Sequence, residues 1–440
     1  MGTRFRPYQP KQMLLLSPDL REWVPEGHLA HQVSEMVDGL ELGAFYEPYA
    51  EDGRRNAPYE PRMMVKILIY AYATGVFSSR KIARKLEEDV AFRMLAAGNF
   101  PQHRTICEFR RRHLQDFRKL FVQVVGLARE MGLVRMGRLS IDGTRVRANA
   151  SRRKAMSYGR MREREQQLSK EIDQLLEQAQ QQDGEEDERY GEDRRGDELP
   201  EELRRREDRL AAIKAAKQRL EAAQREADEQ RGRKPGQDRN PKARRPYKRA
   251  YGEPEEKAQS NFTDPESQIM KTSTEGFQQC YNAQTAVDGG HQLIVATQVS
   301  AKASDQGQMM ELLEEVEETF EETPKQVLAD AGYCNEADLQ ALEERGVDGY
   351  VALGREGKRA VEIDSSKYPA KSRMRKKLAS LAGQAEYARR KWMAEAPHGW
   401  IKEGLGFRRF SLRGLQSVQG EWDLVCLALN IKRMSALMAA

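Results

Sequence analysis

The feature that most constrains the fold of this 440-residue chain is the order of its strand-like and helical segments after Arg138. Apolar or alternating runs predict strands, and longer runs with apolar residues at three- and four-residue spacing predict helices. The order is one strand, two strands joined by a Gly-Gly-His turn, helix, strand, helix, strand and a long helix. This order predicts a mixed α/β (α+β) domain over 136–440. After RLSID, the expected strands are 281–288, 292–300, 326–330 and 349–353, and the expected helices are 306–320, 335–344 and about 372–403.

The same order is typical of a ribonuclease-H-like fold, here interrupted by a charged segment at 152–230. That segment consists almost entirely of Glu, Gln, Arg, Lys and Ala, with apolar residues at helical spacing in two stretches. We expect a coiled-coil-like helical hairpin with narrow apolar seams, and the alternative is a disordered charged tract. The seam residues are Leu168, Ile172, Leu175, Leu176, Ala179, Leu203, Leu210, Ile213 and Leu220.

A basic segment follows the charged one. Residues 231–249 contain nine Lys and Arg against the single acid Asp238, and three prolines argue against a helix. We interpret 231–260 as a flexible basic strap that neutralises nucleic-acid phosphates, and a solvated linker is the alternative. Its expected DNA contacts are Arg244, Arg245, Lys248 and Arg249.

Residues 1–135 are expected to be all-helical and to bind DNA. One helix is predicted from Ser78 or Ser79 to Gly98, and another from Thr105 onward, with a turn at NFPQ between them. Helix, turn and a helix with basic first turns resemble a helix-turn-helix reader of DNA. A helical bundle with a solvated basic face is the alternative. The expected DNA contacts are Arg104, Arg110, Arg111 and Arg112.

Composition narrows the class of protein further. The chain has 74 Lys and Arg against 69 Asp and Glu, so we expect local basic surfaces rather than a uniformly basic protein. Its four cysteines are scattered without a CxxC pair, which favours a reducing cytoplasm over a disulfide framework or a zinc site. The most apolar stretch, 63–77, is too short to span a bilayer. We therefore expect a cytoplasmic protein without a membrane partner.

Two aspartates carry the chemical prediction. Asp142 and Asp330 each end an apolar strand, in LSIDGT and QVLADAG, where an ionised carboxylate is poorly solvated. One such residue could be a helix N-cap, but two in strands that this fold makes neighbours are better explained by a divalent metal. Glu395 on the long helix would supply the third carboxylate. Hard oxygen ligands suit Mg²⁺ or Mn²⁺, and two such ions can hold both oxygens of an in-line displacement at phosphorus.

The run from Tyr387 to Lys402 places basic and aromatic groups around that third carboxylate. In a continuous helix, Glu395 and Lys402 lie seven residues apart on one face, with Tyr387 and Arg390 one to two turns earlier. An ordinary amphipathic surface helix is the alternative for the run taken alone. His398 is interpreted as a packing or phosphate-contacting residue rather than a metal ligand.

These motifs together resemble a known family. SIDGTRVRANAS, ADAGYCNEADL and the run Tyr387-x2-Arg390-x4-Glu395-x6-Lys402 followed by GFRRFSLRG are similar to the DDE transposases of bacterial insertion sequences, in the branch with the Tyr-Arg-Glu-Lys signature. NFTDPESQIMK and GFQQCYNAQTAVD resemble segments before that branch's second aspartate. YEPRMMVKILIYAYATGVFSSRKIARKL and HRTICEFRRRH resemble its helical N-terminal domain.

The resemblance implies a transposase. Asp142, Asp330 and Glu395 match the catalytic triad, which binds two Mg²⁺ (or Mn²⁺) ions, and Tyr387, Arg390 and Lys402 match positions that engage the DNA end. Water would cleave at the ends of the mobile element, and the freed 3′-OH would then attack target DNA. The implied partners are double-stranded DNA, at the terminal inverted repeats and the target, and further copies of the chain in a homodimer or larger complex on the bacterial nucleoid.

Two alternatives remain open. One is a catalytically inactive DNA-binding protein that keeps the transposase fold. Four residues separate Arg390 from Glu395, where the signature usually has three, and Ala396 stands where the family usually has a proline. The other is a ribonuclease-H-like nuclease or junction resolvase, although such chains usually lack the helical front half and the charged insert.

Overall fold

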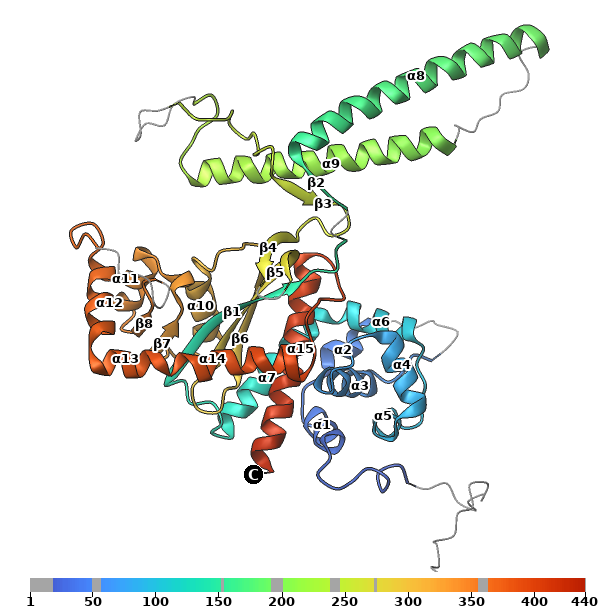
Figure 1. Cartoon of the computed structure of the whole chain (residues 1–440). Helices are drawn as coiled ribbons and strands as arrows, with labels where there is room; N and C mark the ends of the chain where they lie inside the picture. Colours follow the sequence, from blue (N-terminus) through green and yellow to red (C-terminus); the bar gives the residue numbers. More distant parts are fainter. Residues whose placement is uncertain are drawn as a thin grey trace, which may run out of the picture.

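A computed structural model describes residues 19–49, 57–151, 154–190, 201–237, 246–272, 275–354 and 363–439, without the side chains of 175–190 and 201–204. Within these ranges, helices, a mixed sheet and a projecting pair of long helices make up the chain (Figure 1). No helix in the described residues is both long and apolar enough to cross a membrane.

The central sheet is mixed, with the strand order β6-β5-β1-β7-β8, and β4 pairs with the first part of β5. The strands β1, β5 and β6 are antiparallel neighbours, whereas β7 and β8 continue the sheet parallel to β1. The predicted strands are therefore present, and the structure adds β4 within NFTDPESQIMK. The strand bounds are β1 Arg138–Arg147, β4 Gln268–Thr272, β5 Gly276–Asp288, β6 Ile294–Ser300, β7 Gln326–Ala329 and β8 Asp348–Val351.

The described residues before β1 form helices, but not of the expected lengths. The helix predicted from Ser79 to Gly98 breaks at Asp89, because the Asp89 carboxylate accepts from the backbone of Ala91 and Phe92 and caps a new helix. The next predicted helix breaks at His113. The bounds are α1 Leu29–Asp38, α2 Gly43–Tyr46, the 3-10 turn η1 Glu47–Tyr49, α3 Pro61–Ala73, α4 Ser79–Glu88, α5 Val90–Leu95, α6 His103–Arg112 and α7 Leu114–Glu130.

The helix predicted over about 372–403 is also wrong as a single element. Ser380 adopts an extended backbone and its hydroxyl caps the following helix at Gly383, which ends the first segment. The remaining turns finish in a π-helical turn, Trp400–Gly404. The helices of the second half are α10 Gln308–Phe320, α11 Glu336–Glu344, α12 Pro369–Ala379, α13 Leu381–Ala388, α14 Arg390–Gly399 and α15 Leu415–Met438.

The C-terminal helix α15, which we did not anticipate, lies between the sheet and the N-terminal helices (Figure 1). It packs against α7, α3 and the edge strand β6. The Asn430 side chain bonds both the N–H and the C=O of Ile294, and Gln419 accepts from Val299 N, so α15 satisfies backbone groups along that edge. A covered edge cannot pair with another chain.

Between β1 and β4 the chain leaves the sheet. A small ladder of β2 (Ala155–Ser157) and β3 (Gln259–Asn261) leads to α8 (Tyr158–Tyr190) and α9 (Glu201–Gln230), which project from the body in Figure 1. The two helices contact each other through a small buried cluster that includes Leu168 and Ile213. Leu175, Leu176, Ala179 and Leu203, which we expected in the seam, lie outside the described side chains.

Candidate functional site

The sheet brings Asp142 and Asp330 together. Ile141 of β1 is in register with Ala329 of β7, so the two aspartates follow at the same level on neighbouring parallel strands. Neighbouring strands lie about 4.8 Å apart, and side chains at one level point to the same face. Each carboxylate therefore lies within electrostatic reach of the other.

The Asp142 carboxylate is nearly buried and lies among donors. Its Oδ1 accepts from Gly143 N at 2.9 Å, and its Oδ2 lies 3.6 Å from Arg390 Nη1 and 3.8 Å from His398 Nδ1. Thr285, opposite Asp142 in β5, holds the other ring nitrogen of His398 at 3.0 Å. Burial acts to raise the pKa of Asp142, but the His398 hydrogen bond and charge, Arg390 and the Gly143 N–H outweigh it and lower the pKa below its ordinary value.

The pKa of Asp330 is shifted in the opposite direction, upward. Its Oδ1 accepts from Gly332 N at 2.7 Å and caps the 3-10 turn η3, Ala331–Tyr333. Burial raises the pKa of Asp330, and the negative charges of Asp142 and Asp305 raise it further, against the lowering effect of the Gly332 hydrogen bond and Arg390. Two carboxylates with opposite shifts, held close together, favour a positive ion or a proton between them.

Glu395 is on α14, which crosses β1 and β5, but its carboxylate does not join the two aspartates. Its side chain is 53% exposed and accepts from Arg390 Nη2 at 3.3 Å. Arg390 thus contacts both Asp142 and Glu395. Across the part of the chain that the structure describes, no group of three His, Cys, Asp or Glu side chains has a metal-binding arrangement. The three predicted ligands are therefore near one site without forming a complete set.

The remaining residues of the predicted signature lie around the same site. The centre of the Tyr387 ring lies 5.9 Å from the Arg390 guanidinium carbon. The two residues are on different helices, because α13 ends before Arg389 and α14 begins after it. Lys402 is in the π turn rather than on the same α-helix as Glu395, and its Nζ donates to Arg145 O at 3.1 Å. Burial lowers the pKa of Lys402.

Sequence reasoning missed a network beside Asp330. Asp305, in the loop after β6, accepts from Asn282 at 2.7 Å and from Gln284 at 2.8 Å, both on β5. Gln284 also accepts from the Tyr333 hydroxyl, next to the Asp330 turn. The only signal in the sequence was a further acid in a loop before a helix, which is too common a pattern to identify a site.

One predicted DNA contact is wrong. Arg110 is 4% exposed, and its Nη1 donates to Tyr72 Oη and Phe77 O, both at 2.9 Å. Tyr72 in turn donates to the buried carboxylate of Glu421 on α15 at 3.2 Å. Arg110 therefore belongs to the core, because its position on α6 faces α3. The other three predicted contacts of this helix, Arg104, Arg111 and Arg112, are exposed.

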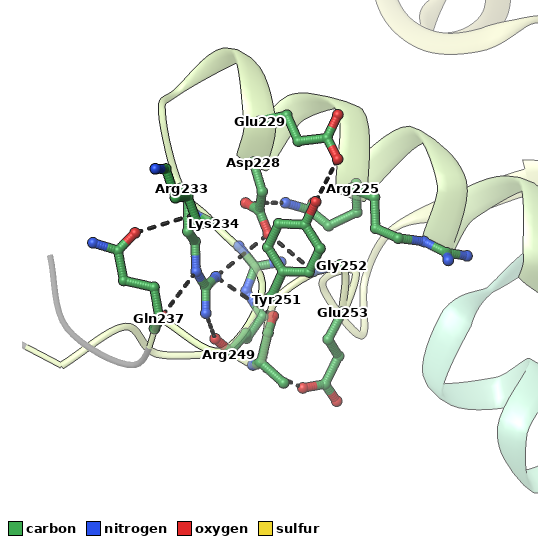
Figure 2. A network of polar contacts seen from close by, with 12 residues as sticks. Arg225, Asp228, Glu229, Arg233, Lys234, Gln237, Arg249, Tyr251, Gly252 and Glu253 are labelled. Atoms are coloured by element: carbon green, nitrogen blue, oxygen red, sulfur yellow. Dashed lines mark hydrogen bonds and ion pairs between the residues drawn. The ribbon is translucent and has the colours of Figure 1, made fainter.

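The described parts of the basic strap fold against the end of α9. Arg233 is 6% exposed, pairs with Asp228 at 3.4 Å and donates to Arg249 O at 2.8 Å (Figure 2). Its guanidinium also stacks on the Tyr247 ring. Lys248 is exposed, and Arg249 pairs with Glu255 at 3.0 Å. Arg244 and Arg245 lie outside the described residues.

Fold and site together define a mixed α/β protein with a pair of aspartates on its central strands and basic groups beside them. Residues 249–431 match the family described as Transposase DDE domain, and residues 18–112 match the family described as Transposase domain (DUF772). These matches indicate an insertion-sequence transposase family and support a transposase function. Such a domain implies a polynucleotidyl transferase that binds DNA and normally uses divalent metal ions. No curated protein and no solved structure matches the chain.

The matched ranges divide the candidate site. Asp330 and Glu395 lie inside 249–431, whereas Asp142 lies between the two matched ranges. Asp142 is nevertheless joined to the matched domain, because its strand β1 is hydrogen-bonded to β5 and β7, which lie within 249–431.

Proposed function

We propose that this chain is a transposase of the Tyr-Arg-Glu-Lys branch with a ribonuclease-H-like catalytic domain. It would cleave DNA at the ends of an insertion sequence in a metal-dependent step and transfer the freed 3′-OH into target DNA. The observation that supports this most is the register of β1 and β7, which puts Asp142 and Asp330 side by side on the two central parallel strands.

The two aspartates fit a divalent metal ion. Their carboxylate oxygens are hard donors, and a cation between them would relieve the repulsion that helps to raise the pKa of Asp330. Glu395 would complete the set after leaving Arg390, which its half-exposed position allows. Bound Mg²⁺ or Mn²⁺ would neutralise phosphate charge and activate the attacking oxygen.

The chain's own residues would bind and orient the DNA. Arg390 has a buried Nε without a hydrogen-bond partner among the described residues, and this donor would reach a phosphate oxygen once the guanidinium leaves Asp142 and Glu395. Tyr387 lies beside Arg390, Lys402 lies over β1 at Arg145, and His398 holds the Asp142 carboxylate. Arg104, Arg111 and Arg112 on α6, together with Lys248, Arg249 and the strap positions Arg244 and Arg245, would contact backbone phosphates of the inverted repeats. A second copy would engage the other DNA end.

One observation favours the alternative, a DNA-binding protein without catalytic activity. Arg390 contacts both Asp142 and Glu395, so a guanidinium takes a place where metal ions would have to act. Metal binding in an active enzyme therefore requires Arg390 to exchange its carboxylate partners for phosphate.

The test is nicking of a labelled duplex that carries the element's end, with Mg²⁺ or Mn²⁺, by the full-length protein and by Asp142→Asn. We expect a loss of nicking of at least about a hundredfold in the variant with unchanged binding to the end. Asp364→Asn, at an exposed turn, is the matched control and should nick normally. Equal nicking by Asp142→Asn would refute the site, and end binding without nicking in either metal would support the inactive alternative.

A further inference from the structure

A cavity of about 350 Å³ opens beside Asp330, and no role has been assigned to most of its lining. Asp142 and Glu395 are not among its lining residues. Gly143 and Thr144, which follow Asp142 on β1, form one part of the wall together with Asp305 and Asp330. The wall away from the acids is basic. Its cations are Arg145, Arg147, Lys271, Lys402 and Arg408.

Three segments that are far apart in the sequence supply these cations. Arg145 and Arg147 are two residues apart on β1, so their side chains share a face at a spacing of about 6.7 Å. Lys271 lies on β4. Arg408 precedes Arg409, which forms an isolated parallel β-bridge with Arg147 of β1. The positive wall is therefore a product of the tertiary fold and continues directly from the strand that carries Asp142.

The charges of the wall are only partly balanced. At its rim Arg147 pairs with Glu275 at 2.6 Å, and Arg408 pairs with Glu403. The Arg145 guanidinium instead donates to the carbonyls of Lys271 and Ala303. Within the described ranges no carboxylate forms an ion pair with Arg145, Lys271 or Lys402. Asp305 and Asp330 lie in the same lining, but the three cations without an ion pair favour an anionic ligand on the basic side of the cavity.

We propose that the cavity binds the phosphodiester backbone of a single DNA strand running from Asp330, with Arg145 and Lys271 on successive phosphates. Glu275 and Glu403 form ion pairs with Arg147 and Arg408 until phosphates displace the two carboxylates. The volume is that of a small-ligand site, so it admits one strand and not a duplex. This inference rests on the proposed function, because it assigns the strand that the acids would act on.

Binding without chemistry tests the proposal separately from catalysis. The full-length protein in EDTA is titrated into a fluorescein-labelled oligothymidine of about ten nucleotides, and anisotropy gives Kd at several salt concentrations. Arg145→Ala and Lys271→Ala should each raise Kd roughly tenfold and lower the salt slope by about 0.7. Glu275→Gln should tighten binding several-fold, because it releases Arg147. The thermal unfolding of each variant checks that it folds.

Matched controls lie on α12, which packs on β8 and α11 and takes no part in the lining of the cavity. Arg373→Ala and Lys376→Ala remove the same charges there and should leave Kd and salt slope unchanged. Arg145→Lys keeps the charge and should retain most of the slope. The proposal is overturned if the site and control variants behave alike, or if Glu275→Gln weakens binding. Loss of nicking by Asp142→Asn with unaltered oligonucleotide binding in Arg145→Ala and Lys271→Ala would remove this inference and leave the proposed function intact.

Discussion

At the residue scale, the lack of a side chain at Gly332 allows two carboxylates to approach each other. A Cβ at this position would lie 2.7 Å from Asp305 Oδ2 and 2.9 Å from Asp330 Oδ1. Real Cβ atoms do not come that close to such atoms, so an added methyl group must displace at least one of the two carboxylates. Its backbone needs no positive φ, and the constraint is therefore one of space alone.

We predict that Gly332→Ala lowers nicking of the element's end by about a hundredfold, since a displacement of about 1 Å can have that effect on a catalytic group. The measurement is single-turnover nicking, with the thermal midpoint as the check on folding. Gly354→Ala adds the same methyl group in open space and should change neither quantity. Full activity in Gly332→Ala would show that the position of Asp330 is not important.

At the scale of elements, the end of α9 is held by one buried ion pair. Asp228 and Arg233 are each 6% exposed in their side chains, and Asp228 Oδ2 also accepts from Gly252 N at 3.0 Å (Figure 2). The pair joins the end of α9 to residues 249–252 of the basic strap. The strap is thereby held at two points along its length, although its composition suggested a flexible segment throughout.

We predict that Arg233→Ala destabilises this joint by on the order of 3 kcal/mol, because it leaves the Asp228 carboxylate buried without a cation. Amide hydrogen exchange of Gly252 should become faster by about a hundredfold under native conditions. Arg231→Ala removes an exposed arginine two residues earlier and is the control. If exchange at Gly252 is the same in both variants, the ion pair does not hold the joint.

Helix breaks also belong to this scale. The residues that end the helices, Asp89, His113 and Ser380, are compatible with a helical pattern in sequence. Asp89 and Ser380 instead turn their side chains to cap the next helix, while His113 is fully buried and stacks against Phe45. Periodicity therefore predicted where helices occur but not where each one ends.

At the scale of the whole molecule, buried polar groups on α15 join the N-terminal helices to the sheet. Arg118 of α7 pairs with Glu315 of α10 at 3.0 Å and with Asp423 of α15 at 3.5 Å. Burial raises the pKa of Asp423 to about 6, against the lowering effect of Arg118 and of hydrogen bonds from Thr297 and Gln419. Burial likewise raises the pKa of Glu315 to about 7, with Arg118 lowering it and Asp423 raising it.

These shifts predict how stability depends on pH. Both acids bind protons more tightly in the folded chain than in the unfolded chain, where their pKa values are about 4. Their contribution to the free energy of unfolding is therefore fully present below about pH 4 and is lost as the pH rises to about 7. Asp423→Asn should remove the contribution of Asp423 to this loss of unfolding free energy, on the order of 3 kcal/mol, as measured by urea unfolding between pH 4 and 8. Glu318→Gln, at an exposed position of the same α10, should keep the wild-type dependence. If Asp423→Asn kept the full wild-type dependence of the unfolding free energy on pH, the raised pKa of Asp423 would not be its cause.

By itself the sequence determined the mixed α/β order, the helical front half, Asp330 at the end of its strand and the resemblance to transposases. The prediction that Asp142 also ends a strand is wrong, because β1 continues past it to Arg147 and pairs with β5 over that length. Local periodicity and motif order carry these properties, and each needs only residues that are near in the chain. The tertiary structure decided which charged residues reach the site. Arg110 turned out to be buried, Glu395 to be paired with Arg390, and Asp305 and Arg145 to line one cavity with Asp330. Burial and ion pairing depend on strand register and on helix breaks that join distant segments, and a one-dimensional pattern does not contain them.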